Sequence, residues 1–118
     1  MAENSKVDVY DPCTRIYLAK AEIDNTIKYN IISLGIALHL SETGAVIQSV
    51  KEPIILISKN RTIIFNSKLK AKLLLLSKKR TNIFINFEFL VSDKLEAQEM
   101  IFGECHRNDL HNVHFSQY

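Results

Sequence analysis

The sequence predicts an α/β fold, a small two-layer sandwich in which helices lie on one face of a mixed sheet in the order β-α-β-α-β-β. Apolar residues recur three or four positions apart at Ile16, Ala19, Ile23 and Ile27, which is the spacing of one helix face. After Pro53 the apolar residues instead form short runs rich in β-branched side chains. Helices confined to one part of such a chain favour a helix layer packed on a sheet.

The first half of the chain is expected to alternate between strands and helices. A short strand at 7–10 precedes a helix over 12–27, for which Pro12 suits the first turn. Residues 28–35 are rich in β-branched and aromatic side chains and predict a strand buried on both faces. A second helix is expected over 36–50, weakened by Gly44 and stopped by Pro53.

The second half is expected to be β-rich. Four segments predict strands, at 54–57, 62–65, 69–76 and 82–91, and residues 77–81 predict a hairpin turn between the last two. The acidic segment 92–100 suggests a short helix with Ser92 or Asp93 as its N-cap. The chain is therefore divided into a flexible lead-in at 1–11, a domain at 12–91, and at 92–118 the short helix with a polar tail, partly disordered beyond Gly103.

Charge is distributed very unevenly along the 118 residues. Nine of the fifteen Lys and Arg residues lie between Lys51 and Arg80 with a single acidic residue, which gives this segment a net charge of +8. The rest of the chain holds six basic and twelve acidic residues, a net charge of −6. Such polarity is typical of a protein that binds nucleic acid or another anionic surface. Solvated strand faces and turns give the same pattern, and both interpretations are open at this stage.

Other features narrow the class of protein. No window of about 18 uncharged apolar residues is present, so a membrane span is not expected. The first residues are polar and lack the apolar centre of a signal peptide. Two cysteines far apart do not make a disulfide framework. We therefore expect an intracellular protein of the cytoplasm or the nucleus.

No catalytic or metal site is expected. The sequence has no nucleophile elbow, Walker loop, zinc-protease pair or dinucleotide fingerprint. Cys105, His106, His111 and His114 lack the paired spacing of a zinc site. His39 lies among apolar residues of a predicted helix, where a hydrogen-bonded packing role is favoured over catalysis. The prediction is a protein that is not an enzyme and that needs no cofactor or metal.

Three adjoining features resemble the Alba family of small DNA- and RNA-binding proteins. They are Tyr17-Leu18-Ala19-Lys20, the Ser33-Leu34-Gly35-Ile36-Ala37-Leu38 segment, and a following helix that leads to a β-hairpin. The resemblance covers roughly residues 13–91. It implies a tight strand-to-helix junction at Gly35, close packing of Ala37 on the sheet, and a homo- or heterodimer. Leu34, Leu38 and residues 84–89 are candidates for the apolar partner face.

The resemblance also implies that a basic hairpin arm contacts phosphates. The loop Asp11-Pro12-Cys13-Thr14-Arg15 lacks the lysine pair of that family, and the helix predicted at 36–50 is less basic than usual. RNA is therefore expected to bind more readily than DNA. The expected nucleic-acid-binding residues are Arg15, Lys59, Arg61, Lys68, Lys70, Lys72, Lys78, Lys79 and Arg80.

Alternatives to this interpretation remain at particular residues. Lys70 and Lys72 share one strand face, opposite Leu69, Ala71 and Leu73, and present their ammonium groups either to phosphates or only to water. Phe65 and Phe84 are expected in the core rather than as stacking platforms. The chain is alternatively a non-catalytic protein-interaction subunit of a ribonucleoprotein or viral assembly. The four leucines at 73–76 favour that alternative, because an exposed edge strand of leucines needs a cover.

Overall fold

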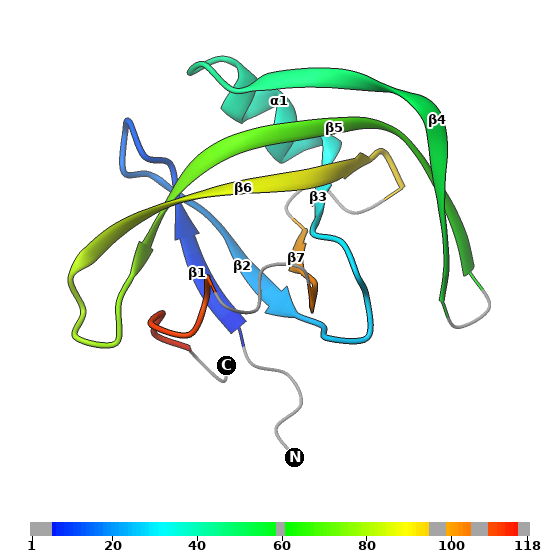
Figure 1. Ribbon diagram of the computed structural model, residues 1–118. Helices are drawn as coiled ribbons and strands as arrows, with labels where there is room; N and C mark the ends of the chain where they lie inside the picture. Colours follow the sequence, from blue (N-terminus) through cyan, green and yellow to red (C-terminus); the bar gives the residue numbers. More distant parts are fainter. Residues whose placement is uncertain (1–5, 59–60, 95–98, 105–108, 116–118) are drawn as a thin grey trace.

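In the residues that the structure describes, the protein is mostly β, with a seven-stranded mixed sheet and a single short helix (Figure 1). The computed structural model describes residues 6–58, 61–94, 99–104 and 109–115. The elements are β1 (Lys6–Tyr10), β2 (Tyr17–Ile23), β3 (Ile31–Ser33), α1 (Leu34–Ser41), β4 (Val46–Ser58), β5 (Arg61–Leu76), β6 (Asn82–Ser92) and β7 (Met100–Phe102). The predicted β-α-β-α-β-β sandwich with a layer of helices is therefore wrong.

The sheet curls until its first strand meets its fifth. The strand order is β1-β2-β7-β3-β6-β5-β4, and β1 also pairs with β5 through Tyr10 opposite Leu74. Six strands therefore form a closed ring, and β4 lies outside it along β5. The β2–β7 and β3–β6 pairs are parallel, whereas the other pairs are antiparallel.

The main core fills the inside of this ring. Alternating residues of β5 and β6, among them Leu69, Leu73 and Phe89, are fully buried there. Ile36, Ala37 and Leu40 of α1 join the same core, as do Leu110 and Val113 near the C-terminus. Figure 1 shows α1 at one end of the ring and the C-terminal segment at the other. Both ends of the core are therefore covered from outside the sheet.

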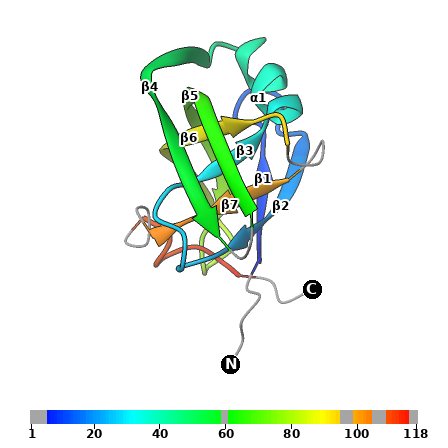
Figure 2. The same cartoon turned by 90° about the vertical axis from the view of Figure 1, so that its right-hand side faces the viewer.

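The hairpin of β4 and β5 extends beyond the ring (Figure 2). Its inner side chains, including Ile54, Leu56 and the fully buried Phe65, pack with Ile27, Ile31 and Leu90 in a second apolar cluster. The register of β4 against β5 shifts between Ser49 and Ile54, the region that contains Pro53. Pro53 thus lies within an edge strand, where a missing amide donor is tolerated, and does not stop a helix as predicted.

The predicted helix at 12–27 is a loop followed by β2. Residues 18, 19 and 21 are buried and Glu22 is exposed, and the strand pairs with β1 over Lys6–Tyr10. The apolar spacing of three and four is therefore coincidental. The residues of β2 bury their apolar side through neighbours that lie elsewhere in the chain, which a local helical pattern does not reveal.

The predicted helix at 36–50 is correct only in its first part. Ser33 is the N-cap of α1, its Oγ accepting a hydrogen bond from the Ile36 amide at 3.4 Å. The helix ends at Ser41, and Gly44 then adopts a φ of 118°, a conformation that glycine accepts readily. From Val46 the chain is strand β4, as its β-branched Val46, Ile47 and Val50 favour.

Several expectations for the other segments are confirmed. The strand at 7–10 is present as β1, the strand within 28–35 is the fully buried β3, and the turn at 77–81 joins β5 to β6. The segments at 62–65 and 69–76 are one continuous strand, β5.

Two expectations for the end of the chain differ from the structure. The range 92–100, for which a helix was expected, has a strand at each end, because Ser92 ends β6 and Met100 begins β7. Residues 95–98 lie outside the described chain. The tail beyond Gly103 was expected to be partly disordered, but its residues Leu110 and Val113 are buried in the core.

Within the described part of the chain no helix is long and apolar enough to cross a membrane.

Candidate nucleic-acid interface

Three lysines line the outer side of β5. Because Leu69, Ala71 and Leu73 point into the core, the alternation of the strand turns Lys68, Lys70 and Lys72 outward, which the sequence predicted for Lys70 and Lys72. Lys68 lies 3.6 Å from the Glu88 carboxylate on β6, and Glu88 also pairs across the sheet with Lys70. Lys72 pairs with the neutral Asn86. The Glu88 carboxylate therefore offsets one of the three positive charges of Lys68, Lys70 and Lys72.

The turn between β5 and β6 adds three more basic residues. The nearly buried Ser77 organises this turn: its amide donates to the Thr81 carbonyl at 2.8 Å, and its Oγ accepts from the Lys79 and Thr81 amides. Lys78, Lys79 and Arg80 are exposed on its outside. We call Lys68, Lys70, Lys72 and these three residues the basic face.

Arg80 and Arg15 share an unusual backbone conformation. Their φ angles are 65° and 64°, and within the described chain they are the residues other than glycine with positive φ. This conformation costs an L-residue on the order of 1 kcal/mol relative to glycine. Strain of this kind is often retained where a side chain has a function. Both arginines are among the residues predicted from the sequence to contact phosphates.

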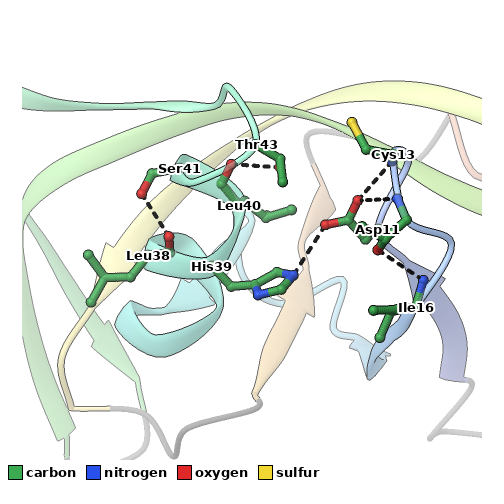
Figure 3. A network of polar contacts seen from close by, with 9 residues as sticks. Asp11, Cys13, Ile16, Leu38, His39, Leu40, Ser41 and Thr43 are labelled. Carbon is green, nitrogen blue, oxygen red and sulfur yellow. Dashed lines mark hydrogen bonds and ion pairs between the residues drawn. The ribbon is translucent and has the colours of Figure 1, made fainter.

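The loop that carries Arg15 is fixed to α1 by Asp11 (Figure 3). The fully buried Asp11 accepts hydrogen bonds from the Cys13 and Thr14 amides at 2.8 and 3.0 Å through Oδ1. Its Oδ2 lies 3.2 Å from Nε2 of His39 on α1. His39 therefore has the hydrogen-bonded packing role that was predicted. Asp11 itself is enclosed and paired.

A groove lies between this loop, the end of α1 and β5. Its volume is about 570 Å³, and Cys13, Leu40, Lys70, Lys72 and Phe84 are among the residues that line it. None of the lining residues described is acidic. The groove forms where the edge of β5 is left open, between its pairing with β4, which ends at Lys70, and its pairing with β1 at Leu74. The Arg15 loop and the lysines of β5 therefore border one concave surface.

Aromatic side chains form a row across the sheet beside the lysines. Phe84 is 48% exposed, pairs with Leu74 and is diagonal to Lys72. On the other side of Leu74, the rings of Tyr10 and Tyr17 meet edge to face with centroids 5.6 Å apart. Tyr17 is 49% exposed, and burial together with the nearby Asp8 charge raises the pKa of its hydroxyl, so the ring is neutral near pH 7. The prediction that Phe84 is a core residue is wrong, whereas that for Phe65 is confirmed.

Other predicted residues lie apart from this surface. Lys59 is outside the described residues, and Arg61 is the first residue of β5, at the far end from the turn. Ala37 is fully buried, which fits close packing of α1, and Gly35 is the second residue of α1. Leu73, Leu74 and Leu75 are buried, so they are not the exposed edge that was expected to recruit a protein.

The residues proposed for an apolar partner face are not gathered in one exposed patch. Leu34 and Leu38 of α1 are 38% and 51% exposed, but Phe87 and Phe89 are buried in the core. Cys105 and His106 lie outside the described residues. Among the residues that are described, no cluster of histidine, cysteine and acidic side chains is arranged to hold a metal ion.

The Asp11 contacts predict a specific dependence of stability on pH. Burial by itself raises the pKa of Asp11, but the Thr14 and Cys13 amides and the neighbouring His39 outweigh it, so the pKa lies below its ordinary value of 3.8. A lowered pKa stabilises the folded state above pH 3.8, and this contribution is lost as the pH falls through the folded-state value. Asp11→Asn should lower the free energy of unfolding at pH 7 by about 1–3 kcal/mol, as measured by urea denaturation.

The same comparison near pH 3 should show a smaller difference between Asp11→Asn and the parent. Glu42→Gln, which makes the same charge change at an exposed carboxyl beside the end of α1, should alter stability little at any pH. An Asp11→Asn variant as stable as the parent at pH 7 would mean that this carboxylate does not hold the loop.

No model of a known protein family matches the chain, and no curated protein matches its sequence.

Proposed function

We propose that the protein is a non-catalytic binder of single-stranded nucleic acid, which it holds through phosphate contacts from the basic face. The observation that carries the proposal is the juxtaposition of Lys70 and Lys72 with the exposed ring of Phe84 on one side of the sheet. Basic side chains attract the backbone of the nucleic acid, and exposed rings stack on its bases. The proposal rests on this arrangement, not on the fold that the Alba resemblance implied.

The geometry favours a single strand over a duplex. A duplex keeps its bases paired, so an aromatic ring on the face of a sheet has no base surface to contact, whereas an unpaired strand offers every base. The basic face also extends along the hairpin: Lys70 lies six residues before the end of β5 at Leu76, roughly 20 Å along a strand, and Lys79 lies in the turn beyond it. That length suits several successive nucleotides. The preference for RNA over DNA stays a prediction.

The turn is well suited to present its charges. Ser77 fixes its backbone through five hydrogen bonds, three with Thr81 and one each with the amides of Lys79 and Arg80. A fixed turn loses less conformational entropy on binding than a flexible one. Lys78, Lys79 and Arg80 therefore add phosphate contacts at one end of the hairpin, and Lys70 and Lys72 make theirs in its middle.

The test is fluorescence anisotropy with labelled oligonucleotides, single-stranded RNA, single-stranded DNA and duplex DNA, at 0.1 M salt. Lys70→Thr with Lys72→Thr removes two phosphate contacts and keeps residues that suit a strand. It should weaken single-strand binding roughly 20-fold. The control, Lys51→Thr with Lys94→Thr, removes the same charge from two exposed lysines elsewhere and should bind nearly as the parent does.

A second arm of the experiment tests the aromatic contact. Phe84→Ala should weaken binding of the single strands roughly fivefold or more, as expected for one stacked base, and should leave duplex binding unchanged. Phe115→Ala changes a ring that is 37% exposed near the C-terminus and serves as the control. If the parent binds none of the oligonucleotides, or if the two lysine pairs are equivalent, the proposal is wrong.

A further inference from the structure

The outer edge of β4 is a strand edge without a partner in the described chain. β4 is the terminal strand of the sheet, and it pairs with β5 along one side only (Figure 2). The closure of the ring gives β1 two neighbours, so the described sheet has this one open terminal strand. An open strand edge presents unpaired amide and carbonyl groups to which another strand can add.

Part of this edge is protected and part is not. Between Ser49 and Ile54 the register shifts, and this stretch includes Lys51, Glu52 and Pro53. Irregularity, charge and proline are the features that keep edge strands from pairing with other chains. Residues 54–58 have none of them: the sequence Ile-Ile-Leu-Ile-Ser is uncharged and pairs in regular register with β5. The five residues are therefore the pairable section of β4.

The same section carries strongly exposed aliphatic side chains. Ile57 is 76% exposed and Ile55 is 59% exposed, and Ile64, directly opposite Ile55 on β5, is 56% exposed. Together they expose on the order of 300 Å² of apolar surface, a size often associated with an interaction site. Ile54 and Leu56 face the other way, into the second apolar cluster.

We propose that this section binds a second copy of the chain, β4 against β4 in antiparallel register about Leu56. A two-fold axis perpendicular to the sheet, midway between Leu56 and the partner's Leu56, places Ile55 opposite the partner's Ile57, and Ile54 opposite the partner's Ser58. Because this axis leaves each face of the sheet on its own side, the three exposed isoleucines of both copies form one apolar patch. The segment is thus complementary to itself, which is the requirement of a two-fold interface.

The size of the contact sets the strength of the dimer. A stable interface buries about 800 Å² on each partner, and the isoleucine patch supplies less than half of this. The dimer is therefore weak and depends on concentration. It is independent of nucleic-acid binding, because Lys70 and Lys72 lie beyond the section of β5 that pairs with residues 54–58.

The first test is sedimentation velocity of the full chain from a few micromolar to near millimolar concentration. The parent should shift from the mass of one chain to that of two. Ile57→Lys, at a largely exposed position where folding tolerates it, should remain a single chain throughout. Val46→Lys adds the same charge at a 61% exposed residue of the same strand, opposite Lys70, and should dimerise as the parent does.

A cross-linking experiment tests the register. In a background of Cys13→Ser and Cys105→Ser, Leu56→Cys places two thiols across the two-fold axis, and mild oxidation should give a covalent dimer. Ile54→Cys, displaced from the axis, should cross-link far less. A parent protein that stays monomeric at all concentrations overturns the proposal. The edge of β4 would then be a site for a strand of another protein. A dimer that survives Ile57→Lys overturns it as well.

Discussion

Gly103→Ala should lower the free energy of unfolding by about 1–3 kcal/mol, the range for a forced clash in a packed interior. A Cβ atom at Gly103 would lie 2.6 Å from the Ile27 carbonyl oxygen and closer still to the Tyr29 carbonyl oxygen. Both are backbone atoms, so no rotamer change relieves the contact. For a chain of this size the melting temperature should fall by roughly 10 °C, as measured by circular dichroism.

The reason for this sensitivity is the junction around Asn30, which is 1% exposed. Its Oδ1 accepts a hydrogen bond from the Gly103 amide at 2.9 Å, and its Nδ2 donates to the Glu88 carbonyl at 3.2 Å. One side chain therefore ties the interior of β6, at Glu88, and the end of β7 to the start of β3. A shift of Gly103 away from Ile27 breaks the first of these bonds and leaves buried polar atoms without partners.

Gly44→Ala is the matched control for this substitution. Gly44 has a positive φ of 118°, but a Cβ there meets no atom within 4 Å. The cost should be on the order of 1 kcal/mol, from backbone strain alone. If Gly103→Ala and Gly44→Ala have the same melting temperature, the segment at 99–104 does not pack against residues 27–29 as described.

Salt should weaken single-strand binding steeply if the basic face holds phosphates. Five contacts, from Lys70, Lys72, Lys78, Lys79 and Arg80, predict a slope of about −3.5 for the logarithm of affinity against the logarithm of salt concentration. Affinity should therefore fall roughly a hundredfold between 50 and 200 mM salt. Anisotropy titrations over this range measure the slope directly.

A variant without these charges should bind weakly and with little dependence on salt. The changes are Lys70→Thr, Lys72→Thr, Lys78→Ser, Lys79→Ser and Arg80→Gly, and glycine suits the φ of 65° at position 80. Circular dichroism checks that the variant is folded. A slope near zero in the parent, or a folded variant with the parent's slope, would contradict the proposed role of the basic face.

The strands of the second half were predictable because their signals are local. Alternation of Leu69, Lys70, Ala71, Lys72 and Leu73 identifies a half-buried strand, and the burial of each residue agrees. The exposure of Phe84 was not predictable in this way. Burial of a phenylalanine is the common outcome, and its exposure follows from the even-numbered register that it shares with Asn86 and Glu88 on the outside of β6.

The first half was misjudged because its strands are completed by distant residues. Alanine in β2 favours a helix by intrinsic propensity, yet Ala19 and Ala21 are small enough to lie inside the curled sheet, where they are buried. Nothing near β2 in the sequence indicates that Met100–Phe102 will pair with it. Similarly, no local signal indicates that loop residue Asp11 is enclosed by α1, 28 positions away at His39.

The position of β7 has a consequence for how the chain reaches its folded state. β7 lies between β2 and β3, although among the described strands it is the last to be synthesised. During translation, β2 and β3 therefore have no common neighbour until residue 102 has left the ribosome. Until then the ring stays open between β2 and β3. Pairings that span so much of the sequence form slowly. Until β7 is in place, the nascent chain exposes the unpaired edges of β2 and β3, and these edges are available to chaperones.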